Sequence, residues 1–447
     1  MVPSLLLFSG EKMPKPRRAL CVVVMAAGDG KRMGGASPKV LLNLMGRSVV
    51  GHVLDAARKL KPARIVVIGG KRLAEVRAAL AGEPGLSFVR QARPLGTAHA
   101  VKQAMAALPK RGAYDVMILN ADSPLVTSAS LKRALSRHRR AKAEVTIISA
   151  KLNDPKGFGR IVRDSRGRCV QIVEERDATA EQRLIDEVNA GQYVTRLDAL
   201  RRLLPRVKNR NAQREYYLTD LVGLADKVAA VPMGDPDEAR GVNDPKELAT
   251  ARQLMRRRVI EDLQASGVEV SAPDLTYVEV GVCVGSGTVL HPFTVIRRGV
   301  SIATRCSVGP FAHLRPGTVL EKGAAVGAFV EVKESTLAEG VKAMHLAFLG
   351  DAEIGAGANV GAGTITANWD GQDHHSTIVE DGVHLGSGTV LVAPVKVGRR
   401  GRTGAGAVVP AGRDVKPGET VVGVPARPLS EEKQGNKGRR RRPRRKS

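Results

Sequence analysis

Apolar and polar positions follow two different rhythms along the chain. From about residue 18 to 245, short apolar runs are separated by amphipathic stretches. The runs at 19–27, 63–70 and 114–122 are nearly continuous, whereas 48–60 carries apolar residues at helical spacing. Continuous apolar runs are typical of strands in a parallel sheet that is covered on both faces. This part of the chain is therefore predicted to form an α/β domain with helices between its strands.

A single helix is expected to follow this domain. Between residues 246 and 266, apolar residues recur at intervals of three or four: Leu248, Ala251, Met255, Val259 and Leu263. Such a stripe lies along one face of a helix. We interpret this segment as a linker helix.

The second half of the chain has a period of six. Aliphatic residues occupy every sixth position without a gap at Val278, Val284, Leu290, Ile296, Ile302, Val308, Leu314, Leu320, Val326 and Val332. After an interruption the count resumes at Ile354 and Val360, and later at Val379, Leu385, Leu391, Val397, Thr403 and Val409. So short a period predicts a β-solenoid in which each hexad forms one flat face of a coil and points its aliphatic residue inward. The hexads resemble the left-handed parallel β-helix of hexapeptide-repeat acyltransferases.

Length and charge limit the possible partners. A chain of 447 residues is long enough for two or three domains. It carries 71 Lys and Arg against 44 Asp and Glu, a formal net charge of +27. Part of this excess lies in 435–447, a block that repels itself and is predicted to belong to a disordered basic tail, 429–447. We interpret the tail as a solubility segment, with contact to nucleic acid or an anionic membrane as the alternative. The remaining charge suits acidic small-molecule substrates.

Cysteine usage and the apolar runs favour a cytoplasmic protein. The four cysteines, Cys21, Cys169, Cys283 and Cys306, form no C-x-x-C pair and no even framework, so reduced thiols are expected. The LLLF stretch within the N-terminal extension 1–17 is too short for a signal segment. No apolar run approaches the length needed to span a membrane.

The loop after the first apolar run combines glycines with cations. The segment MAAGDGKRMGGASPKVL (25–41) matches neither of the common glycine-rich phosphate loops. It is similar to the signature loop of sugar-1-phosphate nucleotidyltransferases. Further segments follow in that family's order: Gln91 with LGTAHA (95–100), NADSPL (120–125), GFGRI (157–161), IVEERDAT (172–179), EVNAG (187–191), EYYLTD (215–220) and GVN (241–243). Joined to a hexapeptide solenoid, this order resembles the bifunctional uridyltransferase–acetyltransferases that make UDP-N-acetylglucosamine, over roughly residues 20 to 428.

The resemblance implies a nucleotidyl-transfer site in the first half. A sugar phosphate would attack the α-phosphorus of UTP, and catalysis would depend on positioning and charge neutralisation. Arg32 and Lys39 would contact the phosphates as catalytic cations, and Asp122 and Asn243 would bind Mg²⁺ through hard oxygen ligands. The residues expected to bind UTP or N-acetylglucosamine-1-phosphate are Ala26, Ala27, Gly28, Gln91, Gly96, Thr97, Gly159, Glu174 and Asn189.

It also implies an acetyl-transfer site in the solenoid. An amine that attacks the thioester of acetyl-CoA needs a base, and His345 matches the family's position for it. Four residues match contacts to glucosamine-1-phosphate: Arg315, Lys333, Phe348 and Asn359. Four more match contacts to acetyl-CoA: Asn368, Trp369, Ser387 and Ala405.

Three positions in the solenoid depart from the family pattern. Phe348 stands where a substrate-binding Tyr is usual, Trp369 replaces a Tyr, and His374 stands where a Lys commonly helps to bind phosphate. These changes are expected to weaken sugar-phosphate affinity more than acetyl transfer itself.

The expected organisation is an α/β, Rossmann-like nucleotidyltransferase domain (18–245), the linker helix, and a left-handed β-helix acetyltransferase domain (267–428). The resemblance implies a homotrimer that makes UDP-N-acetylglucosamine in two steps. Two alternatives remain: a sugar-1-phosphate nucleotidyltransferase of other specificity whose solenoid is weak or inactive, and a regulatory scaffold.

Overall fold

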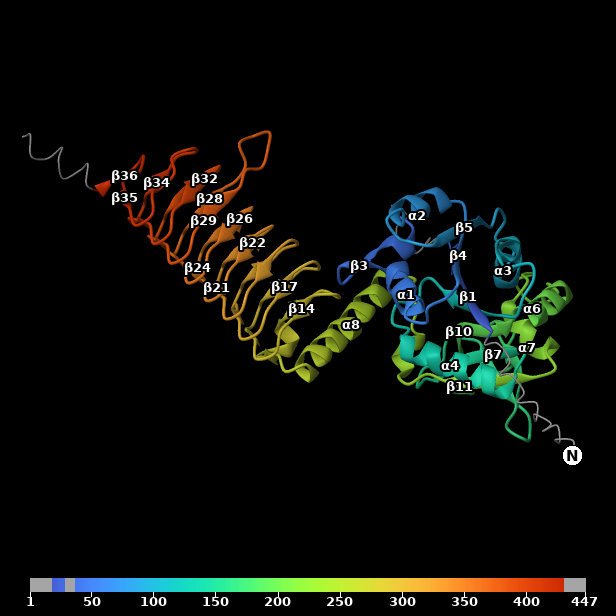
Figure 1. The fold of residues 1–447 in the computed structure, drawn as a ribbon. Coiled ribbons are helices and arrows are strands. Elements are labelled where there is room, and N and C mark those ends of the chain that lie inside the picture. The colour runs from blue at the N-terminus through green and yellow to red at the C-terminus, as the bar shows by residue number, and fades with distance from the viewer. Residues whose placement is uncertain (1–17, 29–36, 430–447) are drawn as a thin grey trace, which may run out of the picture. The chain divides into compact units, whose positions relative to one another are not determined.

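The structure is a computed structural model that describes residues 18–28 and 37–429. The N-terminal extension, Arg32 in the first loop and nearly all of the basic tail lie outside the described residues. Contacts divide the chain into two compact units, Met1–Ala251 and Arg252–Ser447, with the division inside helix α8 (Pro245–Ala265) (Figure 1).

The first unit is built on one mixed sheet with the strand order β11-β7-β10-β6-β1-β4-β5, to which β8 and β9 attach beside β10. The strands are β1 (Ala19–Ala26), β4 (Arg64–Gly69), β5 (Leu86–Arg90), β6 (Tyr114–Asn120), β7 (Val145–Lys151), β8 (Arg160–Arg163), β9 (Cys169–Val173), β10 (Glu187–Arg196) and β11 (Val228–Pro232). A separate hairpin joins β2 (Asn43–Leu44) and β3 (Arg47–Ser48). The helices are α1 (Val49–Arg58), α2 (Leu73–Ala79), α3 (Thr97–Ala104), α4 (Ser128–Ala141), α5 (Ala180–Arg183), α6 (Leu197–Leu203) and α7 (Leu221–Leu224).

The three apolar runs became the centre of this sheet, as predicted. Strand β1 pairs in parallel with both β4 and β6. Along β1, Val22 and Val24 pack into one core cluster while Cys21 and Val23 pack into another, so both faces are buried. This two-sided burial explains why the run is continuous instead of alternating.

One strand departs from the predicted parallel arrangement. Strand β10 runs antiparallel to both β6 and β7. The chain between β7 and β10 forms the antiparallel pair β8–β9 and the short α5, without the long crossover helix that joins parallel neighbours. Gly159 directly precedes β8 and Glu174 directly follows β9, and both residues line a cavity beside the sheet.

The second unit is a three-sided solenoid of parallel strands (Figure 1). Its first sheet contains β12 (Glu269–Val270), β15 (Val289–Leu290), β18 (Ser307–Val308), β21 (Ala325–Ala328), β24 (Lys342–His345), β27 (Asn359–Val360), β30 (His384–Leu385), β33 (Arg402–Thr403), β35 (Thr420–Val422) and the antiparallel β36 (Arg427–Pro428). The second contains β13 (Tyr277–Val278), β16 (Val295–Ile296), β19 (His313–Leu314), β22 (Glu331–Lys333), β25 (Phe348–Gly350), β28 (Ile365–Ala367), β31 (Val390–Val392) and β34 (Val408–Val409). The third contains β14 (Cys283–Val284), β17 (Ser301–Ile302), β20 (Val319–Leu320), β23 (Thr336–Leu337), β26 (Ala352–Ile354), β29 (Thr377–Val379) and β32 (Val395–Val397). The fold class predicted for both halves is confirmed.

The gap in the six-residue count is not a gap in the solenoid. Leu337, Ala343 and Leu349 continue the inward positions and are fully buried. Leu320 pairs with Leu337, which is 17 residues later, whereas Leu314 pairs with Val332, 18 residues later. Leu337 in turn pairs with Ile354, again 17 residues later, so two successive coils that are each one residue shorter shift the count without interrupting the stack.

No helix in the described part of the chain is long and apolar enough to cross a membrane.

The inward residues predict a measurable stability difference. Leu314 is fully buried in the stack, whereas Val319 is 38% exposed. Leu314→Ala should lower the free energy of unfolding of the solenoid by about 2–5 kcal/mol, because it leaves a cavity between coils. Val319→Ala, the matched control, should change it by no more than about 0.5–1 kcal/mol. Denaturant unfolding monitored by circular dichroism checks this, and equal effects would contradict the inward assignment.

Candidate functional site

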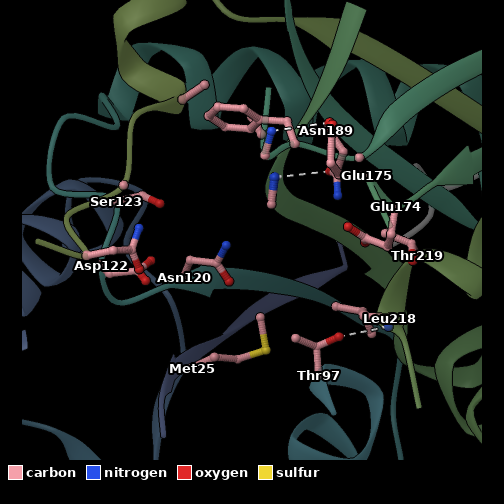
Figure 2. Close-up of a pocket in the computed structure, with 18 of the residues that line it drawn as sticks. Met25, Thr97, Asn120, Asp122, Ser123, Glu174, Glu175, Asn189, Leu218 and Thr219 are labelled. Carbon is pink, nitrogen blue, oxygen red and sulfur yellow. Dashed lines mark hydrogen bonds between the residues drawn. The ribbon is translucent and has the colours of Figure 1, made fainter. Parts of the chain in front are cut away.

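The first unit contains a cavity of about 550 Å³ at the carboxyl end of β1 and β6. It is lined from β1 by Met25, from β6 and its following loop by Asn120 and Asp122, and from the far side by Glu174 and Asn189. Asp122 and Ser123 lie on one side of the cavity, and Glu174 and Thr219 lie on the other (Figure 2). The register of the parallel pair, with Met25 opposite Asn120, brings the end of β1 and Asp122 to the same edge.

A cation lies between the two expected metal ligands. The Nζ atom of Lys39 is 2.5 Å from Oδ2 of Asp122 and 2.6 Å from Oδ1 of Asn243. Lys39 begins the short helix η2 (Lys39–Leu41) and is only 8% exposed. The peptide N–H of Val242 donates to the carbonyl of Asp122 at 2.8 Å, which ties the GVN segment to the β6 loop. Sequence positions 122 and 243 are thereby brought together.

The chemistry of this cluster fits a hard divalent cation. One carboxylate and one amide oxygen converge on a single point, and a positively charged group already lies at that point. Oxygen ligands of this kind, few in number and completed by water and substrate phosphates, suit Mg²⁺. Gly28 lies close by, since a Cβ atom there would be 3.4 Å from Cε of Lys39.

The expected uracil contacts form a rigid corner beside α3. Gln91 follows β5 and is 5% exposed, and Gly96 and Thr97 start α3. The carbonyl of Leu95 accepts from the N–H of Tyr216 at 2.9 Å. The hydroxyl of Thr97 accepts from the N–H of Leu218 at 2.9 Å (Figure 2). The segment 215–220 therefore holds residues 95–97 in place.

The expected sugar contacts lie across the cavity. The N–H of Asn189 donates to the carbonyl of Gly159 at 2.8 Å, and its side-chain Nδ2 donates to the hydroxyl of Tyr193 at 2.7 Å. Burial raises the pKa of Glu174, and the neighbouring carboxylates of Asp177 and Asp220 raise it further, while Thr219 acts in the opposite direction.

Some lining residues were not among the sequence candidates. Asn120, Tyr193 and Thr219 all line the cavity. Asn120 and Thr219 lie inside the quoted motifs, whereas Tyr193 lies two residues beyond EVNAG. Tyr193 is recognised as a lining residue only in the structure, where its hydroxyl accepts a hydrogen bond from Asn189.

In the solenoid, the candidate residues form two lines, one at each end of the strands of the second sheet. We call these lines the two edges of that face. Arg315, Lys333 and Asn368 come at the ends of strands β19, β22 and β28 or directly after them. His345, Ser387 and Ala405 lie at the other edge, where the first sheet turns into the second. Asn359, at the start of β27, lies in the first sheet, and Phe348 opens β25 between the two lines. His345, Ser387, Ala405 and Trp369 are exposed.

The basic groups at the first edge have acidic neighbours. Arg315 Nη1 donates to Oε1 of Glu331 at 2.7 Å. His374 Nδ1 lies 3.3 Å from Oδ2 of Asp351, an oxygen that also accepts from the amide of Asn368. The indole of Trp369 lies over the His374 ring with centroids 4.9 Å apart. His374, which the sequence comparison related to a phosphate-binding Lys, is held beside a carboxylate in this chain.

Three relatives are similar to this chain over nearly its full length. Each is named bifunctional protein GlmU: one from Trichlorobacter lovleyi is 41% identical over 90% of this chain and 95% of its own. One from Xanthomonas campestris pv. campestris is 39% identical over 92% and 97%, and one from Thermobifida fusca is 40% identical over 91% and 92%. The chain belongs to the GlmU family. In addition, the MobA-like NTP transferase domain family matches residues 22–208.

Membership of the GlmU family explains why the two halves occur together. The match to the NTP transferase domain contains Lys39, Gln91, Asp122, Glu174 and Asn189. Asn243 lies beyond it and reaches the cavity only through its contact with the β6 loop. The full-length GlmU relatives extend the likeness through the solenoid.

Gly96 allows a specific test of the nucleotide corner. Its φ is +110°, and a Cβ atom would lie 2.5 Å from the carbonyl oxygen of Tyr216. Gly96→Ala should therefore displace the L-G-T corner and raise the KM for UTP by about tenfold or more, since backbone cannot easily give way. Gly85→Ala is a matched control, because its φ is +72° but nothing lies within 4 Å. Steady-state kinetics that found both variants equally impaired would assign the effect to backbone strain alone.

Proposed function

We propose that this GlmU-family protein transfers an acetyl group from acetyl-CoA to glucosamine-1-phosphate and then couples the product to UTP. The second reaction releases pyrophosphate and forms UDP-N-acetylglucosamine. The observation that carries the proposal is the convergence of Lys39, Asp122 and Asn243 at one end of a cavity whose other end holds Glu174 and Asn189. A cationic and metal-binding end opposite a polar end suits a nucleotide joined to a sugar.

In uridylyl transfer, a phosphate oxygen of the sugar phosphate forms a bond to the α-phosphorus of UTP, and the bond to pyrophosphate breaks. We assign Lys39 and Arg32 to the phosphates, where their positive charges offset the negative charge of the in-line arrangement. The backbone of Ala26, Ala27 and Gly28 borders this region. Asp122 and Asn243 would hold Mg²⁺, which supplies charge neutralisation at the phosphates when bound.

The remaining cavity residues orient the two organic groups. We assign Gln91, Gly96 and Thr97 to the uracil ring. Gly159, Glu174 and Asn189 are assigned to the N-acetylglucosamine ring. The raised pKa of Glu174 reflects burial, and a hydroxyl of the sugar would give this carboxyl a hydrogen-bond partner in place of the water it has lost.

In acetyl transfer, the sugar amine attacks the thioester carbonyl, the C–S bond breaks, and the amine proton passes to His345 and then to the departing thiolate. Arg315 and Lys333 are assigned to the sugar phosphate, together with Phe348 and Asn359 beside the sugar. Asn368, Trp369, Ser387 and Ala405 are assigned to acetyl-CoA. Because His345 and the cations lie at opposite edges of one solenoid face, a complete site needs a second copy, which supports a homotrimer.

We further propose that the enzyme is cytoplasmic. All four cysteines are free, and Cys283 is exposed, as suits a reducing compartment.

The two activities should be separable by single substitutions. Asp122→Ala should reduce UTP-dependent pyrophosphate release by at least about a hundredfold, because it removes charge stabilisation at the phosphates. His345→Ala should reduce acetyl transfer by about two to four orders of magnitude, the range for a positioned base. Each variant should keep the other activity, so each is the control for the other. Pyrophosphate and free-thiol assays check this. If the wild type released no thiol at millimolar glucosamine-1-phosphate, the solenoid would be structural only.

The position of Lys39 predicts a change in metal affinity that does not depend on turnover. Its ammonium occupies the point where the two ligand oxygens converge. In the absence of nucleotide, Lys39→Met should raise the affinity for Mn²⁺ by about tenfold, because a competing charge within 4 Å is removed. Lys156→Met, a change at a lysine that lines the same cavity, is the control. Titration monitored by electron paramagnetic resonance measures free Mn²⁺, and an unchanged or lower affinity would contradict the shared position.

A further inference from the structure

The amide nitrogen of the Gln91 side chain contacts two acceptors. Its Nε2 atom donates to the carbonyl of Gly96 at 3.1 Å and lies 3.1 Å from Nδ1 of His99. Its backbone N–H is anchored to the carbonyl of Gly69 at 2.8 Å. Among residues 18–28 and 37–429, no donor is found on the other amide atom, Oε1.

The carbonyl of Gly96 determines which way the amide points. A carbonyl can only accept, so the nitrogen of the Gln91 amide must face it. That carbonyl also accepts the first intrahelical bond of α3, from Ala100 at 3.1 Å, and is therefore fixed in direction. The second hydrogen of the same nitrogen then points to Nδ1 of His99.

This arrangement selects one form of the His99 ring. Nδ1 must offer a lone pair to Gln91, so the ring is neutral with its proton on Nε2. The amide of Gln103, one turn along α3, lies 3.2 Å from Nε2. Two N–H groups cannot form a hydrogen bond with each other. The amide group of Gln103 is therefore rotated by half a turn about its last side-chain bond, so that its oxygen accepts from the ring N–H. Gln103, His99 and Gln91 thus form one directional chain of hydrogen bonds.

We propose that His99 is a positioning residue for nucleobase selection, which holds the Gln91 amide so that its oxygen faces the bound base. This inference rests on the proposed function, in which Gln91 contacts uracil. An amide oxygen can only accept, so the arrangement selects a base that presents a ring N–H at this position. Uracil and thymine carry such an N–H at N3, between two carbonyl groups. Cytosine presents a bare acceptor at N3, and its amino group could reach the oxygen only if the ring shifted along its edge.

The surroundings of His99 resist its protonation. On its outer side lies a cavity lined by Lys102 of α3, by Lys208 and Arg210, and by Tyr216. Burial lowers the pKa of His99, and the charge of Lys102 lowers it further. A protonated ring would place an N–H against the Gln91 N–H, so one of the two amide contacts would break. Uracil affinity should accordingly fall as the pH drops below about 6.5, through the lowered pKa.

Substitutions test the contact directly. His99→Leu removes the acceptor and should raise the KM for UTP by about three- to tenfold, the value of one neutral hydrogen bond, with kcat within about twofold. The preference for UTP over CTP in kcat/KM should fall by a similar factor. His99→Asn, whose oxygen can take the place of Nδ1, should retain both values. If His99→Leu left both the KM and the preference unchanged, the proposal would be wrong.

A spectroscopic measurement on the wild-type protein tests the proposal without relying on the activity of the variants. In wild-type protein labelled with ¹⁵N at its nine histidines, the signals missing from His99→Asn identify the ring nitrogens of His99. Their shifts should show an unprotonated Nδ1 and a protonated Nε2 at pH 7.5, and the opposite tautomer would overturn the proposal. Gln103→Glu should raise the pH at which the KM for UTP begins to increase, because a carboxylate favours the imidazolium.

Failure of the function and failure of this inference give different results. If the wild type turns over neither UTP nor CTP with N-acetylglucosamine-1-phosphate, the proposed function is wrong. If it turns over UTP with a KM whose pH profile is the same in His99→Asn, the function stands and the role of His99 is rejected. The Asn variant also corrects for titration of the nucleotide phosphates, which both enzymes share.

Discussion

The parallel pairing of β1 with β6 is the constraint on which the nucleotide site depends. Both strands are buried on two faces and end at the same edge of the sheet, so Ala27 and Gly28 after β1 and Asp122 after β6 lie at this edge. The bond from Val242 to Asp122 then brings Asn243 to the same point from the far end of the unit. The largely buried Lys39 places its ammonium between these partly exposed oxygens, which gives all three polar groups a partner.

The solenoid forms its core from a different sequence period than the first unit does. Each coil buries one aliphatic residue per face, and the stacked backbones satisfy each other's hydrogen bonds. The inward positions are therefore occupied by the core, and the candidate residues lie at corners and strand ends. His345 lies at one edge of a face, and Arg315 and Lys333 lie at the other. Asp351 and His374 lie as a pair at the edge that holds Arg315 and Lys333, so the altered residue His374 stands beside a carboxylate there.

The nucleobase corner shows how a small polar group acquires direction. An amide side chain has two nearly identical ends, and only its neighbours decide which end faces a ligand. In this protein the Gly96 carbonyl and His99 both face the nitrogen of Gln91. The corner is held in turn by backbone bonds to Tyr216 and by the bond from Leu218 to Thr97. The direction of the Gln91 amide thus depends on a supporting layer of neighbouring residues.

The sequence alone determined the two architectures, because each has a period that local physics imposes: continuous apolar runs for a doubly covered sheet, and one inward residue in six for the solenoid. It also identified the motif residues, and the structure brings Lys39, Asp122 and Asn243 together. It could not reveal that β10 runs antiparallel, since the direction depends on how the β8–β9 pair returns the chain. Nor could it show that two successive 17-residue coils span the apparent gap between Val332 and Ile354, because the loss of one residue in each coil shifts the count although the stack continues. The pairing of His374 with Asp351, and the direction of the Gln91 amide, depend on atoms from separate coils or turns, and only tertiary packing decides them.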